Sequence, residues 1–503
     1  MQQHRIMPGM RNYVRFNRFV LILTLLAILT MAARVSADSD TWWHMRAGSW
    51  MVENRQILRS DIFSLTRNDQ PWVYPGWLAQ VTLFGAYQGL GFAGLNLFTA
   101  LMVVLAFGLL WAALDGPPIL RAFVIVLAAA ASAVYWAARP HIISFALSAA
   151  FLLVLELAKR GRLRFLWILP VLMVLWVNVH GGFAFGFLLL VIYLTGELIE
   201  LVLDAIQNGG SFAEAWRARK TIILGFVITG LACALASMLN PHGPQMLLYP
   251  FKTVSINVLR DYIQEWQSPN FHQPEVQPFL WLLFAALIAL ALSPRRKTAV
   301  ELLLLTALAY MGFLAARNIA QFALVGALIL ARHGHAALAM LRRKQRESSQ
   351  IPARVANVIN AIILLLAAMA SVLKIVSVST PDVNQQALDA SQPTRAVAFL
   401  QQQHPQGPLL NSYNWGGYVL WALYPDYLSF VDGRTDLFDD EILEEYLTAW
   451  RTDAGWEAVL EKWGIRLVLL EPGAPLAEEL QQRGWDQLYV DDQAVVLAVQ
   501  DAP

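Results

Sequence analysis

Acidic, histidine and arginine side chains gather at the ends of long apolar runs in this sequence. Asp38 and Asp40 follow the first apolar run, and Arg139-Pro140-His141 separates two later runs. Polar side chains at membrane depth are costly, so they are by default functional or paired. The other residues of this polar set are His44, Asp61, Asn178, His180, Asn240, His242, Arg260, Glu265 and Arg317.

Each of these residues alone has an ordinary structural explanation. An arginine at a helix end commonly extends its charged head to the interface, and a polar residue there commonly caps a turn. Ser39 or Asp40, for example, suits the N-cap of the helix that follows. The set is more informative than its members, because all its clusters fall on one side of the topology derived below. That side is not the one that the positive-inside rule enriches in arginine.

Arginines and carboxylates at one membrane face suit the transfer of a group from a lipid phosphate to an acceptor. Guanidinium groups pair with phosphate through two parallel hydrogen bonds, and a carboxylate takes the proton from an attacking hydroxyl. A divalent metal is a further option, although no two of its possible ligands share a recognised short spacing. Those ligands are Asp38, Asp40, His141, His180 and His242. The sequence has no Walker loop, dinucleotide fingerprint or nucleophile elbow, which excludes ATP-driven transport by this chain alone.

The composition is that of a membrane protein. Of the 503 residues, 57% are hydrophobic, whereas soluble domains average roughly 45–50%. The surplus lies in runs long enough for transmembrane helices, which need about 20 residues each, and we predict an α-helical polytopic membrane protein with about eleven of them. The predicted spans are 16–36, 94–114, 119–138, 140–158, 165–179, 181–203, 220–239, 277–292, 298–316, 318–332 and 355–378.

Basic clusters predict which loops face the cytoplasm. If the apolar stretch Trp77–Gly94 also crossed the membrane, one of these clusters would fall outside, so we expect this stretch to lie along the outer interface or to re-enter the membrane. The N-terminus is then cytoplasmic, and the C-terminus is on the outer face of the inner membrane. The first apolar run also resembles a signal peptide, but we expect a permanent anchor because many spans follow. The clusters lie at 159–164, 217–220, 295–297 and 342–346, and before the first span.

The transmembrane part, residues 1–379, is expected to carry a long outer loop at 37–93. Within this loop, Ser39–Glu53 has the spacing of an amphipathic helix. Asp40 and His44 share one of its faces. The other face carries Trp43, Ala47, Trp50 and Met51.

Residues 380–503 are expected to form a small soluble α/β domain outside the membrane. They carry 20 of the 36 acidic residues but only 6 of the 37 basic residues, which argues against nucleic acid as a partner. The polar segment Ser379–Pro393 is interpreted as the linker. The predicted strands are 428–431, 465–470 and 494–499, and the predicted helices are 436–452, 454–463 and 475–483.

Two motifs of this domain combine glycine with polar side chains. Asn411–Tyr418, which contains Asn414, is predicted to be a loop that enters a short helix. Asp432-Gly433-Arg434 follows a predicted strand, where ligand-binding loops often lie. Gly-Gly and Asp-Gly pairs are also common in plain turns. The motifs are therefore either simple turns or an acceptor-recognition lid over the membrane site.

The sequence motifs also carry a family resemblance. The first loop contains Asp38-Ser39-Asp40-Thr41-Trp42-Trp43-His44, Ser60–Ser64 and Pro71–Val73, and later motifs are Trp176–Gly181, Asn240–Gly243, Glu265–Pro269, Asn414–Tyr418 and Phe430–Arg434. Over nearly its whole length the chain resembles a bacterial family of polytopic membrane proteins. That family is similar to the GT-C glycosyltransferases, the superfamily of protein mannosyltransferases, oligosaccharyltransferase and aminoarabinose transferase.

The resemblance implies a GT-C-like membrane domain and a transferase that moves a sugar, with inversion, from a polyprenyl-phosphate donor to an outer acceptor. One acid of the first loop would be the base, with Asp40 the first choice and Asp38 the second. Ser39 separates them, so the chain departs from a side-by-side acidic pair. Superfamily members differ in metal use. The resemblance assigns the phosphate to Arg139, Arg260 and Arg317, and assigns group orientation or metal binding to His44, His141, His180 and His242.

Two other functions stay open from the sequence. A transporter or flippase for lipid-linked glycans would also line a cavity with arginines and histidines. However, it would expose polar residues along its whole path, and several predicted spans carry almost none at mid-depth. A non-catalytic polysaccharide-assembly protein would use the acidic tail as its binding module. The acceptor of a transferase would be a lipid, a glycan or a protein, and membrane lipids are further partners.

Overall fold

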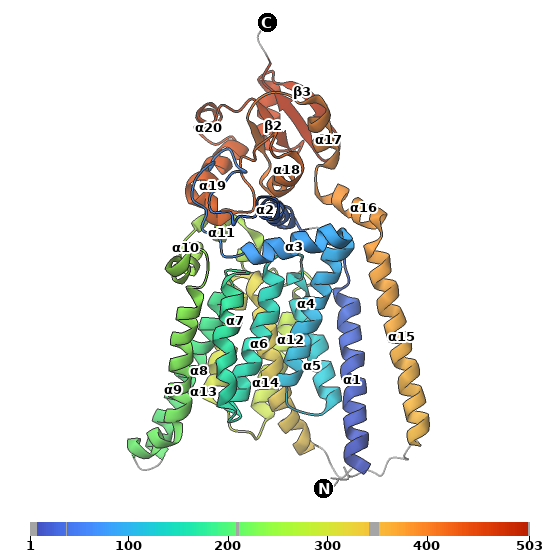
Figure 1. Cartoon of the computed structure of the whole chain (residues 1–503), viewed down its shortest axis with the longest axis vertical. Coiled ribbons are helices and arrows are strands. Elements are labelled where there is room, and N and C mark those ends of the chain that lie inside the picture. The colour runs from blue at the N-terminus through green and yellow to red at the C-terminus, as the bar shows by residue number, and fades with distance from the viewer. Residues whose placement is uncertain (1–7, 37, 208–210, 342–351, 501–503) are drawn as a thin grey trace.

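A bundle of apolar helices dominates the computed structural model, which describes residues 8–36, 38–207, 211–341 and 352–500 (Figure 1). Among these residues, eight helices are long and apolar enough to cross a membrane, and three further apolar helices are shorter. This confirms the prediction of a polytopic helical membrane protein. The long helices are α1 (Pro8–Ala32), α4 (Phe92–Ala113), α5 (Pro118–Ser132), α6 (His141–Lys159), α8 (Phe183–Gln207), α9 (Phe212–Ser237), α14 (Ile319–Leu341) and α15 (Ala353–Ser379), and the shorter ones are α7 (Ile168–Val177), α12 (Gln277–Leu292) and α13 (Ala299–Leu314).

One end of the bundle, called the domain end here, carries the C-terminal domain (Figure 1). Helix α2 (Asp40–Asn54) lies between the bundle and this domain, and α3 (Trp77–Leu90) lies across the end of the bundle. The stretch that begins at Trp77 therefore lies crosswise, as the sequence predicts. Short helices α10 (Tyr249–Val254) and α11 (Asn257–Tyr262) lie at the same end.

The first loop and the C-terminal domain share one hydrophobic core. Trp43, Ala47 and Met51 of α2 are buried in the same cluster as Phe430 and Leu437 of the C-terminal domain. These three residues, with the partly buried Trp50, form the predicted apolar face of the helix, but α2 is also buried on other sides, because Trp42 and Met45 lie in a second cluster. Since α2 packs against the C-terminal domain, the position of its polar face depends on both the first loop and that domain.

The C-terminal domain is a small mixed sheet with helices around it, which confirms the predicted α/β class. Its strand order is β1-β2-β4-β3, with β1 parallel to β2 and the other two pairs antiparallel. The strands are β1 (Leu409–Asn411), β2 (Leu467–Leu470), β3 (Asp486–Val490) and β4 (Val495–Ala498). The helices are α16 (Pro381–Ser391), α17 (Thr394–Gln403), α18 (Gly416–Leu423), α19 (Thr435–Arg451), α20 (Trp456–Lys462) and α21 (Pro475–Gln482).

One local prediction for this domain is wrong. Residues 428–431 are not a strand of the sheet. They form one isolated bridge, between Ser429 and Ser64, and are apolar because Phe430 and Val431 pack into the core shared with the first loop. The segment Ser379–Pro393, interpreted as the linker, is mostly helical, since most of it forms α16, with Pro381 in the first turn where proline is tolerated.

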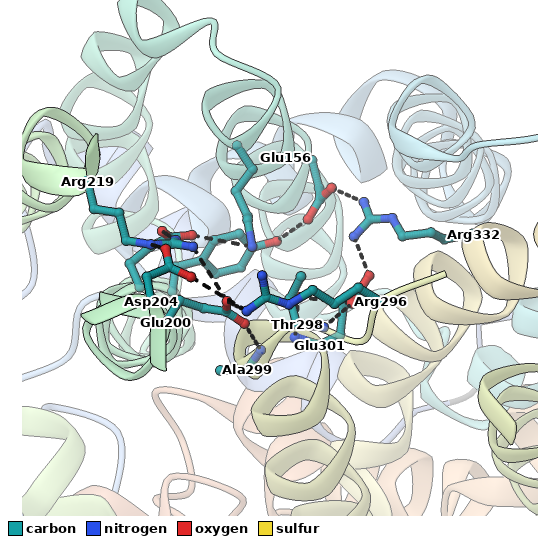
Figure 2. Close-up of polar contacts among 12 residues, drawn as sticks. Glu156, Glu200, Asp204, Arg219, Arg296, Thr298, Ala299, Glu301 and Arg332 are labelled. Atoms are coloured by element: carbon teal, nitrogen blue, oxygen red, sulfur yellow. Dashed lines mark hydrogen bonds and ion pairs between the residues drawn. The ribbon is translucent and has the colours of Figure 1, made fainter. Parts of the chain in front are cut away.

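The opposite end of the bundle, the basic end, is closed by buried ion pairs (Figure 2). Arg332 of α14 pairs with Glu156 of α6 and lies 2.9 Å from Glu301 of α13. A second group joins α8 and α9 to the loop before α13 through Arg219–Glu197 at 2.7 Å, Arg219–Asp204 at 2.7 Å and Arg296–Glu200 at 2.7 Å. Three of the predicted cytoplasmic clusters therefore meet at this end, and the cluster at 342–346 lies outside the described residues.

Candidate active site

A cavity of about 600 Å³ lies at the domain end, between the bundle, α2, the 249–266 segment and the C-terminal domain. Its size is within the range of small-molecule sites, about 300–1,000 Å³. Residues that are far apart in the sequence meet in its wall. Of the residues singled out from the sequence, those that line the cavity are Asp40, His44, Arg139, His141, His180, Glu265, Arg317 and Asn414.

The polar centre of the cavity is a set of carboxylates around Arg139. Its Nη2 lies 2.7 Å from Asp40 Oδ2, and its Nη1 lies 3.5 Å from Asp38 Oδ2 and 3.3 Å from Glu265 Oε2. Asp38 also accepts the backbone N–H of Asp40 at 2.9 Å, at the start of α2. Asp40 therefore faces the cavity, while Asp38 supports the turn that presents it.

Asp40 and Glu265, the two cavity carboxylates that contact Arg139, have opposite acidities. Burial raises the pKa of Asp40 to about 7, and the nearby charges of Asp38 and Glu265 add to this effect, whereas Arg139 opposes it. Burial would also raise the pKa of Glu265, but Arg139 and Arg317 overcome it and hold that pKa at about 2. Of these two groups, Asp40 therefore exchanges a proton near neutral pH, and Glu265 stays charged.

Arg317 is the second arginine of the cavity. Its Nη1 lies 3.4 Å from Glu265 Oε1, and its guanidinium lies over the ring of Trp266, 4.3 Å from the centroid. Glu265 thus sits between two guanidinium groups, one on each carboxylate oxygen. An anion of similar size and charge, such as a phosphate, suits the same position.

The histidines of the cavity are held neutral. Burial, with help from Arg139 and the other histidines, lowers the pKa of His44. Burial, with Arg317 and Arg139, lowers the pKa of His180 to about 3. His141 donates from Nε2 to the carbonyl oxygen of Tyr135 at 2.6 Å. These rings therefore offer neutral donors and acceptors to a ligand.

The cation among the carboxylates of this site is a guanidinium group. Asp38, Asp40 and Glu265 all face Arg139. Within the described residues, no three histidine, cysteine, aspartate or glutamate side chains are grouped as a metal site would need.

The glycine motifs of the C-terminal domain rest directly on the start of α2. A Cβ atom at position 433 would lie 2.8 Å from the Cγ of Asp40 and 2.9 Å from the indole nitrogen of Trp43. A Cβ atom at position 417 would lie 2.6 Å from the carbonyl oxygen of Ser39. Neither glycine has a positive φ angle, so close approach explains their presence better than turn conformation does.

Three predicted site residues lie outside the cavity, in a buried ion triad. Arg434 pairs with Asp61 of the first loop, and its Nη2 lies 2.7 Å from Asp432 Oδ2. Asp61 also accepts the backbone N–H groups of Phe63 and Ser64, at 3.2 and 3.0 Å. All three members are fully buried. The triad joins the first loop to the C-terminal domain.

Asn178, Asn240 and His242 also lie outside the cavity. Asn178 accepts the indole N–H of Trp77 at 2.7 Å and donates to the carbonyl oxygen of Leu239 at 2.8 Å. Asn240 accepts the backbone N–H of His242 at 2.9 Å. These bonds connect the ends of α7 and α9 to the start of α3. The backbone of Arg260 belongs to α11, but its side chain is outside the described residues.

Several cavity residues were not identified from the sequence. Asp436, in the first turn of α19, is the clearest example, because burial raises its pKa to about 6 and the hydroxyl of Tyr249 donates to it at 3.4 Å. From the sequence, only its position at a helix start could have indicated a role for Asp436, and ordinary capping residues occupy the same position. The others are aromatic, and sequence alone does not separate them from core residues: Tyr74, Tyr262, Tyr413, Tyr446 and Trp450.

Comparison with known proteins extends the resemblance. No protein-family model and no curated protein matches the sequence. The structure is similar to the archaeal oligosaccharyltransferase AglB from Archaeoglobus fulgidus, solved with an inhibitory peptide and a dolichol-phosphate, with a TM-score of 0.56 and 13% identity over 98% of this chain and 75% of AglB. ArnT from Cupriavidus metallidurans aligns over 98% of both chains with 14% identity and a TM-score of 0.45. The resemblance suggested by the motifs is thus confirmed at the level of the fold, which the chain shares with the oligosaccharyltransferase AglB.

Proposed function

We propose that this protein is a glycosyltransferase that moves a sugar from a polyprenyl-phosphate donor to an acceptor. The observation that carries the proposal is the contact between Asp40 and Arg139 in one cavity, with the Glu265–Arg317 pair beside it. A base with a pKa near 7 and two guanidinium groups are what this chemistry needs.

In the proposed reaction, Asp40 takes the proton of an acceptor hydroxyl or amide as that group attacks the anomeric carbon of the sugar. The bond between this carbon and the phosphate oxygen breaks, and the electron pair leaves with the lipid phosphate. The configuration at the carbon is inverted. Arg139 and Arg317 stabilise the charge that develops on the phosphate. Asp40 is preferred to Asp38 as the base, because Asp40 lines the cavity and Asp38 supports its backbone.

The proposed donor site lies between Arg139 and Arg317. Glu265 occupies both guanidinium groups in this structure, so a lipid phosphate would compete with its carboxylate for them. AglB has this fold and was solved with a dolichol-phosphate, which supports a lipid phosphate as the donor here.

The acceptor, a lipid, a glycan or a protein, is proposed to enter from the C-terminal domain. Asn414, Tyr446 and Trp450 line that part of the cavity. In this proposal, residues 1–379 are the transmembrane part with the loop 37–93, and residues 380–503 are an extracytoplasmic domain. The basic end would face the cytoplasm of a bacterial cell, because cytoplasmic loops are rich in lysine and arginine.

The ion pairs of the basic end favour a transferase over a lipid-linked glycan transporter. Arg332 and its partners connect α6, α13 and α14, and Glu200 connects α8 to the residues before α13 (Figure 2). A transport path between α6, α13 and α14 would have to separate Arg332 from Glu156 and Glu301, which would leave buried charges without partners. A transferase whose substrates both bind at the domain end needs no such opening.

Glycan profiling with an Asp40→Asn variant tests the proposal. Cells that lack the protein are expected to accumulate a lipid-linked sugar and to lose one glycosylated product. In the variant, the side chain at position 40 keeps its size and loses its basicity. The variant is expected to insert in the membrane but not to restore the normal glycan profile of these cells. The matched control Asp426→Asn, at an exposed position of the C-terminal domain, is expected to correct it. Full correction by Asp40→Asn would refute the transferase and favour a non-catalytic assembly role.

A further inference from the structure

His180 reaches the cavity from the turn between α7 and α8, and polar groups behind the cavity wall hold its ring. The backbone N–H of Gly182 lies 3.0 Å from Nδ1 of this ring. A backbone N–H can only donate a hydrogen bond. The Nδ1 atom must therefore accept, which means that it carries no proton.

A second donor reaches the same nitrogen from helix α6. The hydroxyl oxygen of Ser144 lies 2.9 Å from Nδ1 of His180, and the indole N–H of Trp176 donates to this oxygen at 2.6 Å. Because an indole nitrogen is a donor only, Ser144 is the acceptor of that bond, and its own hydrogen is free to point at His180. Since the Gly182 N–H already makes Nδ1 an acceptor, Ser144 is the donor of the bond to His180.

The glycine pair after His180 makes room for this arrangement. A Cβ atom at position 182 would lie 2.7 Å from both His180 Nδ1 and Ser144 Oγ. At position 181 it would lie 2.7 Å from the ring of Tyr249, which lines the cavity. The His180-Gly181-Gly182 motif therefore combines one side chain that faces the cavity with a position, 182, at which a side chain would displace it and a position, 181, at which a side chain would displace Tyr249.

Since Nδ1 accepts two hydrogen bonds, the neutral ring carries its proton on Nε2. Within the part of the chain that the structure describes, Nε2 makes no hydrogen bond to the protein, and the ring lines the cavity near Arg317 and Arg139. We infer that Trp176, Ser144 and Gly182 are positioning residues that fix His180 as the Nε2–H tautomer, and that this N–H donates to a phosphate oxygen of the lipid-linked donor. The second half of this inference rests on the proposed function.

The arrangement has a chemical consequence for the reaction. With Nε2 protonated and Nδ1 occupied by two donors, His180 has no free lone pair and cannot act as a general base. It adds a hydrogen-bond donor beside the arginines without adding a third positive charge. Proton transfer is thereby left to Asp40, and His180 helps to hold the leaving phosphate.

The tautomer can be measured without any substrate. The test uses the full-length protein with ¹⁵N-labelled histidine in lipid nanodiscs, and the His180 signals are assigned by their loss in a His180→Gln variant. The expected spectrum shows a protonated Nε2 and an unprotonated Nδ1. In Ser144→Ala, the Nδ1 signal is expected to shift, whereas Ser148→Ala, which removes a buried hydroxyl one turn away that bonds only the Ser144 backbone, leaves it unchanged. A protonated Nδ1 in the unaltered protein would overturn the inference.

Binding of a sugar-free polyprenyl monophosphate tests the contact with the donor. The Nε2–H signal of His180 is expected to move as the lipid is added, and Ser144→Ala is expected to weaken binding roughly five-fold, the equivalent of one ordinary neutral hydrogen bond. Ser148→Ala is expected to bind as the unaltered protein does. If the lipid binds without moving the Nε2–H signal, the contact is wrong, although the transferase can stand. If no polyprenyl phosphate binds, the contact and the proposed donor both fail, while the tautomer measurement remains a separate result.

Discussion

The substitution Gly433→Ala tests whether the C-terminal domain helps to position Asp40. The added Cβ would lie 2.8 Å from the Cγ of Asp40, whereas carbon atoms in contact sit about 3.5–4.0 Å apart. The added Cβ would overlap Oδ1 of Asp40 still more closely, so the Asp40 side chain or the loop that carries position 433 must move by at least about 1 Å. A misplacement of that size at a reacting group costs on the order of 100-fold in rate.

The assay for this variant is sugar transfer in membranes, measured together with the thermal unfolding of the purified protein. We expect turnover to fall by about 100-fold, with a loss of unfolding free energy of about 1–3 kcal/mol because the contact is overpacked. Gly473→Ala is the control in the same domain, since a Cβ there meets nothing within 4 Å. Unchanged turnover in Gly433→Ala would refute the idea that this contact sets the position of Asp40.

Three further predictions follow from the charges of the cavity and of the buried triad. Because Asp40 must be deprotonated to act as the base, kcat/KM should rise about tenfold per pH unit below pH 7 and level off above it, and a profile without this limb would contradict the raised pKa. Arg317→Lys should raise the KM for the donor about 10-fold, since a point charge replaces a forked hydrogen-bond donor. The control Arg395→Lys, on the exposed surface, should leave this KM unchanged. Equal effects of the two substitutions would argue against a phosphate at Arg317. Asp61→Asn should lower the unfolding free energy by about 3–5 kcal/mol, because Arg434 is buried and loses a charged partner, and a melting temperature equal to that of the Asp426→Asn control would exclude this role.

The helices of the membrane part could be predicted because their signal is local. An apolar run and its basic flanks specify a span without reference to the rest of the chain. The strand predicted at 428–431 shows the limit of such reasoning. These residues are apolar because the first loop covers them, and that partner lies more than 350 residues earlier in the sequence.

The same limit applies to the polar residues. Asp40, Arg139 and Glu265 were predicted as parts of one polar set, and the structure places them in one cavity. The sequence could not distinguish them from Asp61 and Arg434, which neutralise each other away from the cavity. Both groups consist of charged residues near loops. Only the three-dimensional arrangement determines whether a charged side chain is neutralised in a buried ion pair or lines a cavity.

Asp436 and Ser144 were missed for a related reason. Each has an unremarkable local sequence, at a helix start and inside an apolar helix. Each has its role because the fold places a residue from elsewhere in the sequence beside it. Tyr249 contacts Asp436, and His180 contacts Ser144.

The core shared by α2 and the C-terminal domain has a consequence for biosynthesis. When the ribosome has made the first loop, Trp43 can already contact Trp72 and Tyr74 of that loop, but Phe430 and Leu437 of the same cluster are still to be translated. The packing of α2 is therefore completed only at the end of synthesis. A nascent chain released before that point would have its membrane helices but not the cavity that the C-terminal domain helps to line.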